Sequence, residues 1–76
     1  MEKLVKMFAR VLEVSPEEIN DLTSPENVDV WDSLKFMQLV TEFEAEFALT
    51  LEVENILKLK SFADFKRLLS EKNALD

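Results

Sequence analysis

Apolar side chains recur at helical spacing along this chain, and this periodicity limits its fold more than any other feature. Within residues 32–48, one helical face collects Phe36, Leu39, Val40, Phe43 and Phe47. A second stripe, near the N-terminus, consists of Leu4, Met7, Phe8, Val11 and Leu12. A third, near the C-terminus, consists of Phe62, Phe65, Leu68 and Leu69. Because each stripe must be buried against another, we expect an all-α fold, a small antiparallel four-helix bundle.

The bundle is expected to form a single domain over residues 1–76, since a chain of this length supports only one core. Three longer helices are predicted over residues 2–13, over residues 32–48 and from residue 61 onward. A short helix is predicted over residues 53–57, with Val53, Ile56 and Leu57 in the core. Its surroundings also fit an alternating strand, but no second strand is predicted to pair with it. Residues 73–76 are expected to fray.

Two polar residues are predicted to cap the longer helices. Asp32 stands directly before the second apolar stripe and Ser61 directly before the third, and both residue types favour the N-cap position. Trp31 precedes Asp32, and Phe36 follows it by four residues, which is the spacing of a hydrophobic staple. The start of the second long helix is therefore well specified by local sequence.

The segment between the first two long helices is predicted to be a long connection. In the motif SPEEI, Ser15 is expected to cap a short helical turn, with Pro16 at its first position and Glu18 completing a capping box. Residues 21–30 are expected to be extended. The chain contains no glycine, so backbone positions with positive φ are expected to use Asn or Asp.

Composition excludes several classes of function. The chain has no Cys and no His, which removes disulfides, thiolate or imidazole catalysis and the usual zinc ligands, so we expect neither an enzyme nor a metal site. Sixteen acidic and nine basic residues give a net charge of −7, which repels nucleic acid. The N-terminal stretch carries charges between its apolar residues, unlike a signal peptide. We therefore expect a cytoplasmic monomer without membrane insertion.

Ser33 lies in the triplet Asp-Ser-Leu, at the start of the second long helix. It is a poor candidate for a catalytic nucleophile, because no His can act as its base and no glycine-flanked turn holds it. A modification by an anionic group fits better, since the free N–H groups and the positive dipole end of a helix start stabilise an anion. A plain cap at the helix start is the competing interpretation.

The arrangement of these motifs resembles the acyl carrier protein family. The shared features are the DSL triplet that opens an amphipathic helix, the long loop before it, the EFEAEF end of that helix, and a short third helix followed by a fourth. The resemblance implies a 4′-phosphopantetheine arm on Ser33, installed from coenzyme A by a phosphopantetheinyl transferase. It also implies a non-enzymatic carrier that holds acyl or related intermediates as thioesters. The missing cysteine agrees with this, because the arm brings its own thiol.

The resemblance assigns roles to the neighbours of Ser33. Asp32 matches the acidic residue that assists magnesium-dependent transfer of the arm. The outward face of the same helix matches the surface that acyl-loading and acyl-processing enzymes contact, and its residues here are Leu34, Met37, Gln38, Thr41 and Glu44. Ordinary solvent-exposed side chains are the alternative interpretation of this face.

The sequence also departs from carriers of bulk fatty-acid synthesis. Trp31 precedes the triplet, no glycine stands shortly before it, and Lys35 and Gln38 occupy positions where acidic residues are common. These differences favour a specialised carrier in a dedicated pathway, such as polyketide, aminoacyl or modified-lipid assembly. The main alternative is a protein-interaction module of the same fold that lacks a prosthetic group. A small hydrolase is a third and weaker alternative, since only carboxylates remain as general bases.

Overall fold

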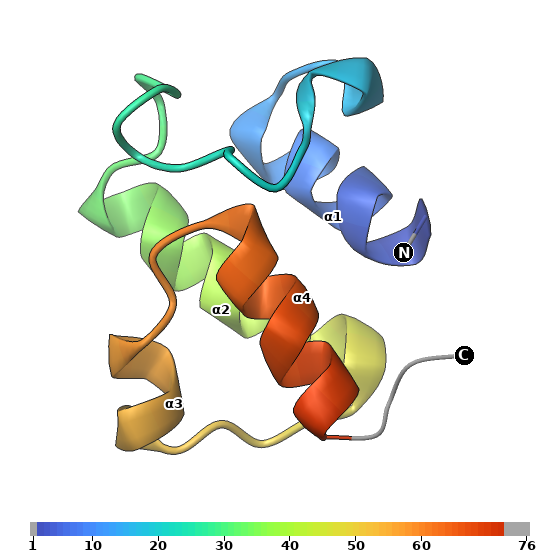
Figure 1. Cartoon of the computed structure of the whole chain (residues 1–76), viewed down its shortest axis with the longest axis vertical. Helices are drawn as coiled ribbons and strands as arrows, with labels where there is room; N and C mark the ends of the chain where they lie inside the picture. Colours follow the sequence, from blue (N-terminus) through green and yellow to red (C-terminus); the bar gives the residue numbers. More distant parts are fainter. Residues whose placement is uncertain (1, 73–76) are drawn as a thin grey trace.

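The computed structural model describes residues 2–72, and these residues form the predicted all-α architecture (Figure 1). The elements are α1 (Glu2–Leu12), a 3-10 turn η1 (Pro16–Glu18), α2 (Ser33–Phe47), α3 (Val53–Leu57) and α4 (Phe62–Glu71). No strand is present among the described residues, so the helical interpretation of residues 53–57 is confirmed. Residues 73–76, which were predicted to fray, lie outside the described part of the chain.

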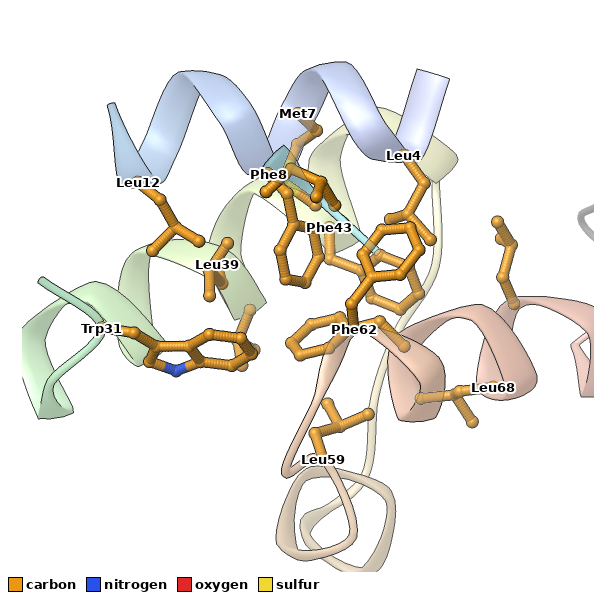
Figure 2. Close-up of a cluster of buried hydrophobic side chains, with 14 of the residues drawn as sticks. Leu4, Met7, Phe8, Leu12, Trp31, Leu39, Phe43, Leu59, Phe62 and Leu68 are labelled. Carbon is orange, nitrogen blue, oxygen red and sulfur yellow. The ribbon is translucent and has the colours of Figure 1, made fainter. Parts of the chain in front are cut away.

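Aromatic rings form the centre of the core (Figure 2). The ring of Phe8, on α1, lies edge-on to the rings of Trp31, Phe62 and Phe65, with centroid distances of 5.6, 5.0 and 4.8 Å. Phe65, on α4, also meets Phe43 of α2 at 5.2 Å. Edge-to-face pairs contribute about 0.5–1.5 kcal/mol each beyond their buried area. This cluster joins the three longer helices and the residue that precedes Asp32.

The predicted core is correct for α4 and needs correction around α3. Val53 and Leu57 are 70% and 69% exposed, so the prediction that they are buried was wrong. Only Ile56 of α3 packs against the core, and it is half-buried. The buried apolar residues are instead Leu51 and Leu59, which flank the helix. A helix of five residues turns only a narrow face inward, so the adjoining loop residues fill the remaining space.

Among residues 2–72, two residues have positive φ, and neither is Asn or Asp, contrary to the prediction. Glu13 has φ of 60° and Ala48 has φ of 53°, and each directly follows a helix, α1 or α2. The hydrogen bonds that close these helix ends explain the choice. The N–H of Val14 donates to the carbonyl of Ala9 at 3.1 Å, and the N–H of Leu49 donates to that of Glu44 at 3.0 Å. These bonds satisfy carbonyl groups that would otherwise be left free, which offsets the steric cost of a left-handed residue with a Cβ.

The connection before α2 consists of turns, although residues 21–30 were predicted to be extended. The N–H of Asn27 donates to the carbonyl of Ser24 at 3.1 Å, and the N–H of Trp31 donates to that of Val28 at 3.0 Å. At the start of this connection, η1 confirms the predicted helical turn. Its predicted capping box is wrong, because Ser15 makes no capping bond and its hydroxyl donates to the carboxylate of Glu17.

The connection is fixed to α4 through Thr23, which is 2% exposed. Its carbonyl accepts a hydrogen bond of 2.8 Å from the N–H of Phe62, in the first turn of α4. An ion pair of 2.8 Å between Asp21 and Lys66 joins the same two segments at the surface. The loop that leads to Ser33 is therefore held against the helical core rather than projecting from it.

The left-handed cap of α2 leads to a stability test. We expect Ala48→Gly to raise the free energy of unfolding by about 0.5–1 kcal/mol, because glycine adopts positive φ without a Cβ clash. The matched control is Ala45→Gly, at an exposed position inside the same helix, which should lower it by about 0.5–1 kcal/mol. Urea unfolding monitored by circular dichroism measures both. A loss of stability in Ala48→Gly as large as that in the control would contradict the role of the cap.

Candidate functional site

Asp32 fixes the start of α2. It has extended φ and ψ, and its Oδ1 accepts a hydrogen bond of 3.0 Å from the N–H of Lys35. Its carbonyl accepts a second bond, of 2.8 Å, from the N–H of Phe36. The predicted N-cap is therefore confirmed. Since these bonds occupy two of the N–H groups in the first turn, the position of the next residue, Ser33, is closely defined.

Ser33 is the first residue of α2, and it is exposed. Within the described part of the chain, its hydroxyl has no hydrogen-bond partner, and neither do the backbone N–H groups of Ser33 and Leu34. Such free N–H groups, together with the positive end of the helix dipole, create a favourable environment for an anion. The exposure of Ser33 and the free bonding capacity around it therefore fit a phosphodiester on its oxygen.

A groove of about 930 Å³ opens beside Ser33. It runs between the start of α2, the preceding loop and the segment that joins α3 to α4. Its apolar wall includes Trp31, Phe36, Ile56 and Leu59, and charged side chains such as Asp21, Glu26 and Lys60 lie around it. A flexible group attached to Ser33 would thus have both an apolar surface and open solvent within reach.

The far side of the groove is fixed by the first turn of α4. Ser61 caps this helix as predicted, with its Oγ accepting from the N–H of Asp64 at 3.4 Å. Partial burial opposes ionisation of Asp64, but hydrogen bonds from the N–H of Lys60 and from Arg67 hold the pKa of its carboxyl below the ordinary value. The carboxylate is therefore charged near neutral pH and ties the groove segment to α4.

The outward face of α2 lies where the sequence predicts it. Leu34 and Met37 are 67% and 61% exposed, and Gln38 and Thr41 are exposed as well. Glu44 differs from these four residues, because it is half-buried and its Oε2 accepts a hydrogen bond of 2.8 Å from the N–H of Leu51. That bond fixes the loop after α2 and leaves only part of the carboxylate for other contacts.

No group of three or more potential metal ligands occurs among residues 2–72. The groove and the anchored Thr23 were not indicated by the sequence pattern, because both depend on contacts between segments far apart in the chain. The short motif NDLT over residues 20–23 would have been the local signal, since the N–H of Asn20 donates to Thr23 Oγ1 at 2.9 Å.

Comparisons with known proteins show which family this chain resembles. Residues 2–69 match the family described as the phosphopantetheine attachment site. An acyl carrier protein of Petrotoga mobilis is 34% identical over 76 residues, which cover 99% of this chain and 88% of the relative.

A solved structure shows the same fold. The solution NMR structure of the holo acyl carrier protein from Geobacter metallireducens superposes with a TM-score of 0.82 at 27% identity, over 97% of this chain and 88% of that one. The chain therefore belongs to the acyl carrier protein family. It is a carrier and not a catalyst, and it holds acyl intermediates on covalently attached 4′-phosphopantetheine. In the described part of the chain, no helix has the length and hydrophobicity needed to cross a membrane.

The cap geometry predicts how substitutions at Asp32 affect stability. Asp32→Ala should lower the free energy of unfolding by about 1 kcal/mol, because the N–H of Lys35 loses its acceptor. Asp32→Asn is the matched control and should stay within a few tenths of a kcal/mol, since Asn caps as well as Asp. Urea midpoints compare the three proteins. Equal destabilisation by both substitutions would show that charge, and not capping, is what Asp32 contributes to stability.

Proposed function

We propose that Ser33 is the residue that carries the 4′-phosphopantetheine arm. The observation that carries this proposal is the exposed hydroxyl of Ser33, unbonded within the described residues, at the first position of α2. Two free backbone N–H groups stand beside it and favour a phosphate there. The groove next to Ser33 leaves room for the arm.

Attachment requires a phosphopantetheinyl transferase as partner and coenzyme A as donor. The Ser33 oxygen bonds to the phosphorus that bears pantetheine, while the pyrophosphate bond of coenzyme A breaks and adenosine 3′,5′-bisphosphate leaves. The proton of the Ser33 hydroxyl is released to the solvent. Asp32 assists this step through its charge, with Oδ2 free of hydrogen bonds within the described residues. Asp32→Asn, which retains a capping side chain, is expected to slow the transfer without unfolding the protein.

The match to an attachment-site family over residues 2–69 favours this function over an interaction module without an arm. The hydrolase alternative has no support, because the chain contains neither His nor Cys to activate a nucleophile or act as one. The carrier interpretation also accounts for the exposed serine, which neither alternative requires.

Partner enzymes are proposed to dock on the outward face of α2. Leu34 and Met37 offer apolar area that a partner can desolvate, and Gln38 and Thr41 offer polar contacts beside it. Glu44 contributes charge at the far end of this face, although its bond to Leu51 limits its freedom. The face stands next to Ser33, so a docked enzyme has the arm within reach.

We further propose a specialised carrier that acts as a single-domain monomer in the cytoplasm. Lys35 and Gln38 make the docking face less acidic than that of a bulk fatty-acid carrier, so steering toward a basic enzyme patch is weaker. Partners of this carrier must then depend more on shape and apolar contact, which suits a dedicated set of acyl-loading and acyl-processing enzymes.

Mass spectrometry tests the attachment site. Incubation with coenzyme A, magnesium and a broad-specificity phosphopantetheinyl transferase should add one phosphopantetheine to the wild-type chain and none to Ser33→Ala. Ser61→Ala is the matched control, because Ser61 also stands at a helix start beside the same groove, and it should be labelled normally. Undiminished labelling of Ser33→Ala, or an unlabelled wild-type chain after exposure to several transferases, would defeat the assignment.

The docking face is tested with the same transferase as partner. Met37→Lys should raise the KM for the unmodified carrier by about tenfold, because a buried apolar contact worth about 1.4 kcal/mol is replaced by a charge. Ser70→Lys, at an exposed site on α4, adds the same charge away from the face and should leave KM unchanged. The proposal fails if both variants behave alike, or if titration with the transferase moves only NMR signals of α1.

A further inference from the structure

The indole of Trp31 holds a buried hydrogen-bond donor that the fold does not use. Trp31 is 3% exposed, and its Nε1 has no hydrogen-bond partner among the described residues. A buried N–H without an acceptor is costly, and buried tryptophans usually find a partner for this atom. Phenylalanine would fill an apolar site without this cost, so the indole nitrogen calls for an explanation beyond packing.

The core fixes the orientation of this donor. The indole lies edge-on to the rings of Phe8 and Phe65, with centroids 5.6 and 6.3 Å away. In Figure 2 its nitrogen lies on the edge of the ring that is turned away from α1 and Leu39. Trp31 is also part of the wall of the groove beside Ser33, two residues along the chain. Trp31, which carries the unpaired donor, and Ser33 therefore line the same groove.

We propose that the Trp31 indole N–H donates a hydrogen bond to a carbonyl oxygen of the arm or of its cargo when the arm lies in this groove. The inference rests on the proposed attachment at Ser33. The arm contains amide carbonyls, and an attached acyl group adds a thioester carbonyl. Either oxygen supplies the acceptor that the fold lacks, and the bond holds the loaded arm against the bundle.

A neutral carbonyl suits this donor better than the phosphate does. The groove around Trp31 includes the apolar side chains of Phe36, Ile56 and Leu59, and a charged group loses more hydration free energy than a neutral one on entering such surroundings. The phosphate is better accommodated at the exposed helix start, where N–H groups and water reach it. We therefore expect Trp31 to bind a neutral carbonyl group beyond the phosphate of the arm, and not the phosphate itself.

Access to the donor requires a local rearrangement, because Nε1 is covered in this structure. Phe36 and Ile56 are only half-buried, and Leu57 is exposed, so side chains of the groove can change rotamer without opening the aromatic core. Trp31 itself stays in place, since its ring is packed against Phe8 and Phe65. The rearrangement therefore moves side chains that line the groove and leaves the Trp31 indole in place.

The test uses the fact that the chain contains one tryptophan and so gives one indole N–H signal in a proton–nitrogen NMR spectrum. Four forms are compared: unmodified, with the free arm, with a short acyl thioester, and with an alkyl thioether of equal length. A downfield shift on addition of the free arm assigns the acceptor to an arm amide. A downfield shift with the thioester but not with the thioether assigns it to the cargo carbonyl. Both outcomes support the proposal.

A matched variant separates the hydrogen bond from packing. Trp31→Phe keeps an aromatic ring but removes the donor, so loading should raise its melting temperature by about 4 °C less than it raises that of the wild type. A carbon-13 label on the bound carbonyl should also resonate at a different position in the variant. If Trp31→Phe does not fold, a benzothiophene analogue of tryptophan keeps the ring size without the N–H.

Mass measurement distinguishes failure of this inference from failure of the attachment site. If no phosphopantetheine is added to Ser33, the proposed attachment is wrong and the role of Trp31 falls with it. If the mass increases but the indole signal is the same in all four forms, only the role of Trp31 is overturned. Equal gains in melting temperature on loading for wild type and Trp31→Phe would overturn it as well.

Discussion

The fold depends on the contact between Phe8 and the aromatic rings around it. The chain has no disulfide to constrain it, so its stability rests on burying apolar surface in one small core. Phe8 brings α1 to Trp31, Phe62 and Phe65, and Phe65 extends the contact to Phe43 of α2. Loss of this ring would separate α1 from the start of α4 and from the residue that leads into α2.

The same contact places Ser33, the residue proposed to carry the arm. Three consecutive residues have three different surroundings: Trp31 is held in the core, Asp32 caps α2, and Ser33 faces solvent. The buried indole fixes the backbone on one side of Ser33, and the helix fixes it on the other. The backbone that carries this exposed hydroxyl has few alternative conformations, which would lower the entropic cost of its recognition by the proposed transferase.

The sequence was sufficient to predict the features that depend only on the local pattern of residues. The caps Asp32 and Ser61 follow from residue type before an apolar stripe, and the outward exposure of Leu34 and Met37 follows from 100° per residue. The errors occurred where tertiary contacts decide. Val53 and Leu57 were wrongly assigned to the core, because the pattern of a five-residue apolar segment does not show which side of the helix faces inward. The left-handed Ala48 could not be read from residue type, since the closing bond from Leu49 to Glu44 decides its conformation.

Two of the exposed apolar residues lie beside the groove, where an attached chain and a partner enzyme would meet. Met37 and Leu57 both line it, and both remain more than half exposed. They stand on α2 and α3 respectively, so the wall that an attached chain would touch continues onto the face that a partner would touch. An enzyme that docks on Met37, as proposed, would therefore sit at the mouth of the groove and cover apolar area there. If cargo lies in the groove, both contacts would use one surface. Removal of the cargo would then expose side chains that a partner can bury, which would link delivery of the cargo to recognition of the carrier.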